Sequence, residues 1–404
     1  MSPHFEAENA PTAVDLFAGC GGATYGLMSA GFDVRAAWEV ERNARYTYQV
    51  HHCEPNEIAL HGDASHVRPA KVPDDLGLLF AGPECQGFSA AGGEINPDDP
   101  RNEHIFTVLE WVSACHPKLV IIENVCGLTD LHTQVHETVV SNLSEADPGY
   151  QVSSIKLDAA AYGIPQRRNR VFILAARRDF GAPEQWRPPR ALTTTQPKLS
   201  DFTAEDHPKQ GVRTARDALG DLPAPLPSLP PAEDPVHTTV GELRPYVDGS
   251  QFEQHYADPH STPQPVTRDG EEVWIPPNHV GTDHEEQTRR QMANWPHGFC
   301  GSSVTERRLA PDEPAPTVTV SNGTPPVHYQ GPTPPLPDDV DVSPVRRLTV
   351  REVARLQSFP DWYTFTGTKS DQYRQVGNAV PPLLVDQIAR HLRETVLYVT
   401  PARA

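Results

Sequence analysis

Cys85 lies in the segment GPECQGFS (82–89), directly after the apolar run 76–80. A cysteine attacks as its thiolate, and the adjacent carboxylate of Glu84 disfavours that anion. Cys85 is therefore either a nucleophile or a small core residue. Other groups that could act with it are Glu123, in Glu123-Asn124-Val125, and the arginines of Gln166-Arg167-Arg168-Asn169-Arg170. Taken singly, Glu123 could cap a helix and the arginines could form a solvated face. Their placement in the fold therefore decides whether they form a site with Cys85.

Six apolar runs predict the strands that position these residues: 13–17, 34–40, 76–81, 119–122, 152–157 and 171–175. Ile105, Val108, Leu109 and Val112 have the i, i+3, i+4, i+7 spacing of an amphipathic helix. Strands that alternate with helices predict an α/β fold, with a mostly parallel, doubly wound sheet and helices on both faces. Ligands gather at the carboxyl edge of such a sheet, where Cys85, Glu123 and the arginines are expected.

A glycine turn, DLFAGCGG (15–22), follows the first predicted strand and precedes a helix that begins near Thr24. Its glycines let the backbone approach a ligand, and the helix start offers free amides. The G-x-G-G spacing differs from the dinucleotide G-x-G-x-x-G pattern. Glu39, about 20 residues on, is placed to take both hydroxyls of a ribose, and Asp63 to meet an adenine amino group. This set favours a nucleoside without a pyrophosphate, although a plain strand-to-helix turn also explains the glycines.

The chain changes character after the first predicted domain, which covers residues 1–184. From 185 to 345 prolines cluster and apolar runs shorten, which predicts a loop-rich insert with its own small fold. Regular patterns return in 346–404, which we expect to pack on the first domain. There Thr349-Val350-Arg351-Glu352 has the form of a capping box for a helix over 350–359, and Pro381-Pro382 opens a helix over 383–396.

Composition limits the classes of function. The net charge of −19 argues against a general polyanion binder, but binding follows the local field. No run of 18 apolar residues occurs, so we expect no membrane span, and the polar N-terminus predicts a cytoplasmic protein. The six cysteines form no CxxC pair, and His51-His52-Cys53 lacks a second ligand pair, so no metal site is expected.

Six segments in order make the chain resemble the C5-cytosine DNA methyltransferase family: DLFAGCGG, GPECQGFS, Glu123-Asn124-Val125, KLDAAAYGIPQRRNRVF (156–172), RRLTVREVARLQSFPDWY (346–363) and QVGNAVPPLL (375–384). They span nearly all of the chain outside 185–345. The resemblance implies a Rossmann-like methyltransferase fold that uses S-adenosylmethionine, with the insert as target-recognition domain. It also implies base flipping in a specific double-stranded DNA sequence and a covalent cysteine adduct.

The resemblance also assigns residues. Cys85 attacks carbon 6 of cytosine, Glu123 acts at ring nitrogen 3, and Arg170, with Arg168 nearby, contacts the base and orients Glu123. The cofactor positions are Phe17, Gly19, Gly21, Glu39, Asp63, Asn378 and Val380, and the DNA-binding positions are Gln86, Ser89 and Gln166. Val40 stands where the family often has an aromatic residue after the ribose carboxylate, so adenine stacking is weaker or Trp38 contributes to it.

One departure and two alternatives remain. The family has proline before the nucleophile, whereas this chain has Glu84. A transfer RNA methyltransferase of the same superfamily is one alternative, but those relatives carry a much shorter insert. A DNA-binding pseudo-enzyme is the other, motivated by Glu84 alone. We expect a monomer whose partner is double-stranded DNA, and a separately encoded restriction endonuclease is left open as a second partner.

Overall fold

The structure, a computed structural model, describes residues 10–53, 56–83, 103–180, 189–194, 210–226, 265–268, 271–274, 276–318 and 324–397. The described residues form two compact units. The sheet unit takes the described residues within His4–Tyr162, Arg168–Ala191 and Val380–Ala404, and the insert unit takes those within Gly163–Arg167 and Leu192–Ala379.

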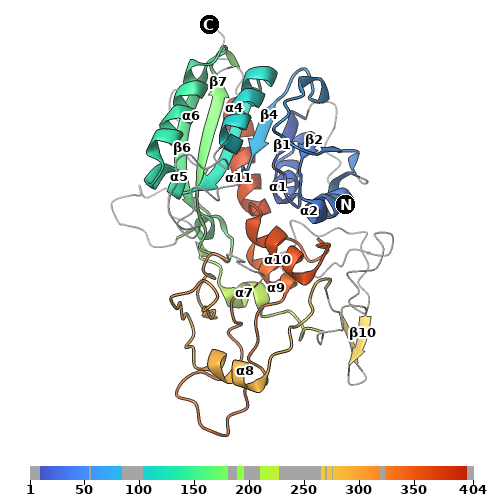
Figure 1. Ribbon diagram of the computed structural model, residues 1–404, viewed down its shortest axis with the longest axis vertical. Helices are drawn as coiled ribbons and strands as arrows, with labels where there is room; N and C mark the ends of the chain where they lie inside the picture. Colours follow the sequence, from blue (N-terminus) through green and yellow to red (C-terminus); the bar gives the residue numbers. More distant parts are fainter. Residues whose placement is uncertain are drawn as a thin grey trace. The chain divides into compact units, whose positions relative to one another are not determined.

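The sheet unit is built on a seven-stranded sheet with the order β3-β2-β1-β4-β5-β7-β6 (Figure 1). Its strands are β1 (Thr12–Leu16), β2 (Asp33–Trp38), β3 (Ala59–His61), β4 (Leu78–Ala81), β5 (Leu119–Val125), β6 (Tyr150–Asp158) and β7 (Asn169–Arg177). Only β7 runs antiparallel to its neighbours, β5 and β6. The order reverses between β1 and β4, so the carboxyl ends of these two strands flank the position where open α/β sheets bind ligands.

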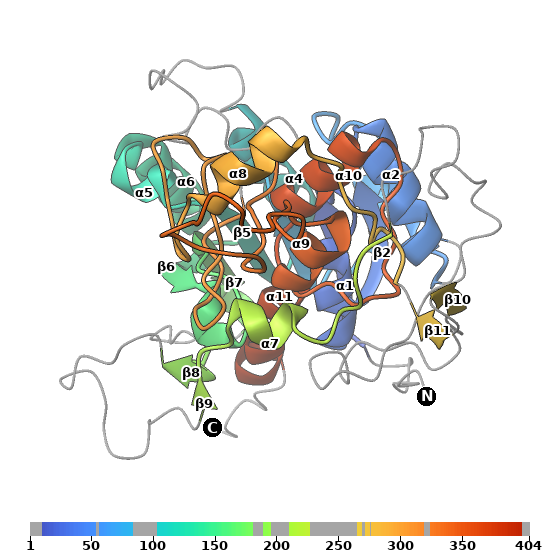
Figure 2. The same ribbon diagram turned by 90° about the horizontal axis from the view of Figure 1, so that it is seen from below.

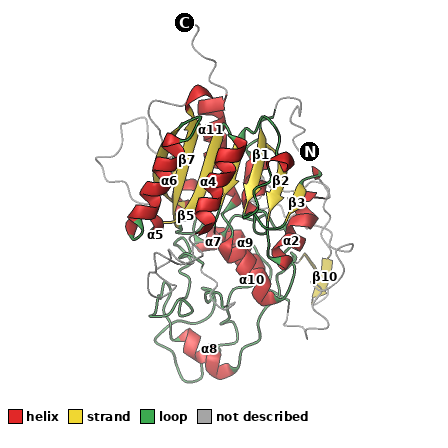
Figure 3. Ribbon diagram, turned by 45° about the horizontal axis from the view of Figure 1, so that its top comes forward, coloured by secondary structure: helices red, strands yellow, loops and turns green. Residues whose placement is uncertain are grey.

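Helices cover both faces of this sheet (Figure 3). They are α1 (Gly22–Ser29), α2 (Arg42–Tyr48), α4 (Glu103–Cys115), α5 (Gly127–Asp130), α6 (Thr133–Glu145) and α11 (Pro382–Leu392). Helices α4 and α6 lie on one face, while α1 and α11 pack together on the other (Figures 2 and 3). The strands are therefore apolar on both sides, as expected for a parallel sheet.

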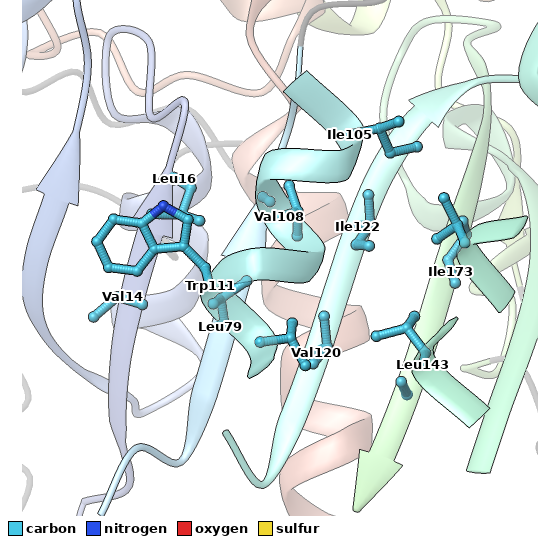
Figure 4. Packing of buried hydrophobic residues seen from close by; sticks show 14 of the residues in the cluster. Val14, Leu16, Leu79, Ile105, Val108, Trp111, Val120, Ile122, Leu143 and Ile173 are labelled. Atoms are coloured by element: carbon cyan, nitrogen blue, oxygen red, sulfur yellow. The ribbon is translucent and has the colours of Figure 1, made fainter. Parts of the chain in front are cut away.

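One core cluster shows how the alternation of strand side chains fills the face under α4 (Figure 4). Val14, Leu79 and Val120 lie on the sheet face beside Val108 and Trp111 of α4, Ile173 lies on the same face nearer Leu143, and all are fully buried. The alternate strand residues, such as Leu78 and Ile121, are equally buried on the other face. Hydrophobic burial on both faces thus holds the sheet that carries the site.

The structure confirms the six predicted strands, the helix around Ile105–Val112 and the α/β class. The capping box is also confirmed, because Thr349 Oγ1 accepts from the Glu352 amide and the Thr349 amide donates to Glu352 Oε2 at 2.8 Å. The sequence patterns did not predict β3, a three-residue edge strand, or helix α6, of which only Val139 and Leu143 are buried.

The insert unit has little regular structure among its described residues. Its elements are β8 (Thr193–Thr194), β9 (Gln210–Gly211), α7 (Ala215–Leu219), β10 (Pro265–Arg268), β11 (Glu271–Trp274), α8 (Glu286–Ala293), α9 (Val350–Leu356) and α10 (Lys369–Asn378). Helices α7 and α9 contact each other, as do α9 and α10. A small apolar cluster, which includes Met292, Val327 and Val345, packs beside α8.

The unit boundary differs from the expected one at residue 345. Helices α9 and α10 belong to the insert unit, and the chain joins the sheet unit only from Val380. The returning helix α11 then packs on α1, as expected for the tail. Among the residues that the structure describes, no helix combines the length and apolar character needed to cross a bilayer.

Candidate active site

The site begins at the carboxyl edge of the sheet, where β1 and β4 diverge. Leu16 pairs with both Trp38 on β2 and Ala81 on β4, so the segments after these strands start at the same level. The Gly82 amide donates to the Leu16 carbonyl at 3.3 Å, and the Ala18 amide donates to the Trp38 carbonyl at 2.9 Å. Three loops are thereby joined at one edge.

The glycine turn after β1 has a backbone that favours glycine. Gly19 has φ +57° and Gly21, the N-cap of α1, has φ +95°. Phe17 also has a positive φ, of 58°, and its ring lies 5.4 Å from the His104 ring. A Cβ built on Gly19 meets no described atom within 4 Å, so the backbone is open to a ligand on that side. These features fit the close approach of a nucleoside.

Glu39 closes this turn from the end of β2. One carboxylate oxygen accepts from the Gly19 amide at 2.8 Å, and the other accepts from the amides of Val40 at 2.9 Å and Glu41 at 2.6 Å. Burial raises the pKa of Glu39, and these three amides act in the opposite direction. Fixed amides orient the carboxylate, whose remaining lone pairs suit the two hydroxyls of a ribose.

Asp63 lies at the rim of a cavity of about 270 Å³, lined by Trp38, His61, Gly62, Asp63, His66 and Arg68. Hydrogen bonds from Ser65 lower the pKa of Asp63. The next residue, Ala64, is held by a 2.7 Å hydrogen bond from the Trp111 indole to its carbonyl. Val40 exposes 74% of its surface beside Glu39. The sheet thus offers a carboxylate, an apolar surface and a partly enclosed space where the sequence predicts an adenosine.

Glu123 and Arg170 form an ion pair at the same edge. Their strands pair antiparallel, and Arg170 Nε lies 2.9 Å from Glu123 Oε1. Only 10% of the Glu123 side chain and 13% of the Arg170 side chain are exposed, so water screens the pair weakly. Arg170 also donates to its neighbour's carbonyl, at Asn169, over 2.8 Å. The pair supplies an oriented acid and a fixed cation.

Gly82 and Pro83 connect this pair to the end of β4. A Cβ on Gly82 would lie 3.7 Å from Val380 Cγ2 and 3.9 Å from Glu123 Oε2. The side chain of Asn124 donates to the Pro83 carbonyl at 3.4 Å. Val380, a predicted cofactor residue, is therefore close to Glu123, and the segment that leads to Cys85 starts beside the ion pair.

Other predicted residues lie elsewhere or outside the described residues. Cys85, Gln86 and Ser89 fall outside them. Arg168 is buried, and its amide donates to Asp158 Oδ1 at 3.1 Å. Asn378 ends α10 in the insert unit, so no contact of it with the glycine turn is described.

Gln166 differs from the expectation of a DNA-binding side chain. It is fully buried in the insert unit, where it donates to the Leu356 carbonyl at 3.1 Å and accepts from the Val318 amide at 3.3 Å. Both ends of its amide are therefore occupied by backbone. We assign Gln166 to the packing of the insert unit.

Sequence reasoning also missed the contribution of Asn124, although it stands inside the quoted Glu123-Asn124-Val125. Its Oδ1 accepts from the Val125 amide at 2.9 Å while its amide group reaches Pro83. A polar residue in an otherwise apolar buried strand was the available signal, because buried polar groups need hydrogen-bond partners.

Comparison with known proteins shows the family of this chain. The model of the C-5 cytosine-specific DNA methylase family matches residues 12–394. Type II methyltransferase M.DdeI from Desulfomicrobium norvegicum is 30% identical over 418 residues, which cover 94% of this chain and 88% of the relative. Type II methyltransferase M.AgeI from Thalassovita gelatinovora is 29% identical over 95% of this chain and 98% of the relative.

Solved structures share the fold. An E. coli prophage-encoded protein described as a DNA modification methyltransferase aligns with a TM-score of 0.65 and 23% identity, over 96% of this chain and 99% of its own. The S. pombe Dnmt2 methyltransferase aligns with a TM-score of 0.56 and 18% identity, over 95% and 98%. The chain belongs to the C-5 cytosine-specific DNA methylase family. It is a DNA (cytosine-5-)-methyltransferase that uses S-adenosylmethionine.

Proposed function

We propose that the segment after β4, the end of β5 and the start of β7 form the catalytic centre, with Cys85 as nucleophile and Glu123 and Arg170 acting on the target cytosine. The observation that carries this proposal is the 2.9 Å ion pair between Glu123 and Arg170, beside the Pro83 carbonyl that Asn124 holds. Cys85 follows Pro83 by two residues. Arg168 supports the same corner of the sheet from within.

The chemistry needs these residue types. Carbon 5 of cytosine is a poor nucleophile, and it lies in the stacked duplex, so the base is flipped out at a cost of about a few kcal/mol. Addition of Cys85 Sγ to carbon 6 breaks the 5,6 double bond and makes carbon 5 nucleophilic. Glu123 holds or donates a proton at ring nitrogen 3 and stabilises the developing charge. Once carbon 5 has taken the methyl group, loss of its proton to water would re-form the 5,6 double bond and break the bond between carbon 6 and Cys85 Sγ.

S-adenosylmethionine supplies the methyl group when it is bound. In this proposal Glu39 takes the ribose hydroxyls, Asp63 meets the adenine amino group, and Phe17, Gly19 and Gly21 form the surface below. Asn378 and Val380 serve the methionine part. The fit is supported by the open space at Gly19, by the three amides that orient Glu39, and by the cavity beside Asp63.

The insert unit is proposed as the target-recognition domain for a specific double-stranded DNA sequence. Gln86 and Ser89 are proposed DNA contacts in the loop that carries Cys85. The type II relatives favour a role in a restriction-modification system with a separately encoded endonuclease. We further propose a monomer that acts in the cytoplasm, where cellular DNA is modified.

Trapping on a duplex that contains 5-fluorocytosine tests the mechanism. Fluorine at carbon 5 blocks the last step, so we expect a covalent protein–DNA adduct that disappears in Cys85→Ala and forms slowly in Glu123→Gln. The wild-type chain is given S-adenosylmethionine and fluorocytosine-containing DNA with many different sequences. If it then forms no adduct, the DNA-binding pseudo-enzyme is favoured instead. Bisulfite sequencing of DNA from an expressing host then gives the methylated sequence.

Glu84 is the feature that separates this chain from the family pattern. Glu84 and Cys85 lie outside the described residues, and we propose that the chain tolerates Glu84 beside the nucleophile. Methylation by Glu84→Pro should then stay near the wild-type rate at neutral pH. A many-fold rise would indicate repulsion of the thiolate, and a complete loss would indicate a direct role of Glu84 at the base.

A further inference from the structure

A buried polar chain lies beneath the glycine turn and takes no part in the mechanism above. The Thr24 hydroxyl, on α1, donates to Asp15 Oδ2 on β1 at 2.7 Å. Thr24 Oγ1 is in turn 2.9 Å from the Tyr48 hydroxyl on α2. All three residues are fully buried. The chain therefore ties together the strand before the turn, the helix after it and the next helix along.

This chain reaches the turn itself through a neighbouring histidine. The ring of His52, in the π-helical turn Gln49–Cys53, lies 4.7 Å from the Tyr48 ring. His52 is hydrogen-bonded to the backbone of Gly21, the N-cap of α1. Buried groups thus hold the glycine turn from below.

Asp15 has an incomplete environment in this chain. Oδ1 is buried and accepts no hydrogen bond from any described residue, although a carboxylate oxygen has two lone pairs. Its pairing partners on the flanking strands are Ala37 and Phe80, which are apolar. The pKa of Asp15 is raised to about 7, chiefly by burial; hydrogen bonds from Thr24 act against this rise, and the Glu39 carboxylate adds to it. At neutral pH the group is therefore divided between its acid and its anion.

The groups that face Asp15 from the surrounding elements supply no cation among the described residues. The turn contributes Cys20, whose pKa burial raises to about 12, and the end of β2 contributes Glu39. From the α2 side come Tyr48 and His52, and burial lowers the pKa of His52 to about 3, so it is neutral. On α11, Arg390 is engaged by Ser29, at the far end of α1, and by Asp386.

The two ligands of the turn differ by one charge. S-adenosylmethionine carries a sulfonium cation, whereas the demethylated product carries a neutral thioether. Glu39, which holds the Gly19 amide, already acts on Asp15 across the turn, so a cation bound on the turn acts over a similar range. An added cation favours the ionised form of a carboxyl group, and by linkage the ionised carboxyl favours the cation equally.

We propose that Asp15 is a positioning residue that loses its proton when the sulfonium ligand binds to the glycine turn and regains it once the methyl group has gone. The anion strengthens binding of the methyl donor, and the neutral acid weakens retention of the product. The proton is exchanged with solvent. On average, each turnover therefore releases less than one proton per protein molecule and takes it up again. This inference rests on the proposed assignment of the turn to the cofactor.

Calorimetric titration of the full-length wild-type chain in phosphate and in Tris tests the inference, because the two buffers differ in ionisation enthalpy. At pH 7 we expect release of about half a proton per S-adenosylmethionine, since the Asp15 pKa is about 7, and none at pH 9. S-adenosylhomocysteine should release less. Equal release with both ligands, or none with S-adenosylmethionine, overturns the proposal.

Asp15→Asn should abolish the release and reduce the preference for S-adenosylmethionine over S-adenosylhomocysteine by roughly fivefold. Release that persists in Asp15→Asn belongs to another group and refutes the assignment. If the wild-type chain binds neither ligand, the cofactor site itself is wrong, and the inference falls with it. A chain that binds both ligands without proton release refutes only the inference.

Thr24→Val keeps the test decisive if Asp15→Asn does not fold. Valine removes the hydrogen bond that favours the anion, so proton release should grow at pH 8 and its midpoint should move to higher pH, while Thr24→Ser restores the wild-type profile. Tyr150→Phe is the matched control, since it removes another buried hydroxyl, bonded to the Pro117 carbonyl at 2.8 Å. It should leave the release unchanged, and a midpoint that does not move in Thr24→Val contradicts the proposal.

Discussion

The sheet unit and the insert unit are stabilised by different kinds of interaction. In the sheet unit, apolar side chains on both faces of parallel strands are buried, and the strands satisfy each other's backbone groups. The insert unit has short described strands and a small apolar cluster. Buried arginine side chains donate many of the hydrogen bonds within the insert unit.

Arg308 is the clearest case. It is fully buried, and its two terminal nitrogens donate to the carbonyls of six residues: Ala293, Trp295, Tyr329, Gln330, Gly331 and Pro332. Arg351 likewise donates to the Pro277, Pro360 and Tyr363 carbonyls. Proline has a carbonyl but no N–H, so a proline-rich chain has more backbone acceptors than donors. Guanidinium groups with five N–H donors correct that imbalance.

The largest effect should come from breaking the chemistry of the sheet unit without disturbing its packing. Glu123→Gln keeps the shape of the side chain but removes the charge opposite Arg170, so we expect single-turnover methylation to slow by about 10²–10⁴-fold. Glu137→Gln, on the exposed side of α6, is the control and should be unaffected. A rate within threefold of wild type in Glu123→Gln would remove Glu123 from the mechanism.

Packing in the sheet unit is tested next by Trp111→Ala. The indole is fully buried in the core cluster, so its loss should lower the free energy of unfolding by about 3–5 kcal/mol. Urea unfolding followed by circular dichroism measures this. Trp111→Phe keeps most of the ring but loses the hydrogen bond to Ala64, so it should cost less stability and still weaken binding beside Asp63. Equal losses in both variants would show that the hydrogen bond, and not packing, dominates.

Arg308→Lys tests the hydrogen bonding of the insert unit. A lysine has three donors on one nitrogen and leaves several carbonyls unsatisfied, so we expect a loss of about 3 kcal/mol. Hydrogen exchange should quicken in segments 293–309 and 327–332 and stay slow in β1, β4 and β5. Arg290→Lys, which changes an exposed pair with Glu286, should cost less than about 0.5 kcal/mol. Exchange that quickens equally in both units would contradict the division between them.

The smallest effect concerns pH. Burial lowers the pKa of His328 to about 4, so this residue is neutral in the fold but protonated when unfolded between about pH 6.5 and 4. The unfolded chain then binds more protons, and stability falls as the pH drops through that window. His328→Gln should flatten this fall. Asp15→Asn should make the fall in stability steeper, because it removes a carboxyl group whose raised pKa stabilises the fold as the pH drops. Equal slopes of stability against pH in the His328→Gln and Asp15→Asn variants would refute the raised pKa of Asp15.

The sequence predicted the sheet unit well for a physical reason. Strand β4 and residues 119–122 of β5 are continuous apolar runs because both of their faces are buried, and the candidate catalytic residues lie at or just beyond the ends of these strands. The edge strand β3 was missed because it has only 3 residues and exposes part of its surface. In α6 too few positions are buried for the apolar residues to show a clear helical repeat in the sequence.

The role of Gln166 had no local signal. Its partners Leu356 and Val318 lie 190 and 152 positions further along the chain, so no short pattern can report them. The same holds for Arg308, whose partners are carbonyls, which every residue carries. The domain boundary near 345 was placed where proline-rich sequence ends, although α9 and α10, regular helices with capping boxes, belong to the insert unit.

The short segment Gly163–Arg167 has a consequence for engineering new specificities. It belongs to the insert unit although it is separated in sequence from Leu192–Ala379. In a chimaera that exchanges only residues 192–379 with a relative, Gln166 and Arg167, which bond to backbone groups of Val318, Leu356 and Ala315, would face the relative's segment in place of their own. A transplant of target recognition therefore has two donor fragments, and its breakpoints fall at 162/163, 167/168, 191/192 and 379/380.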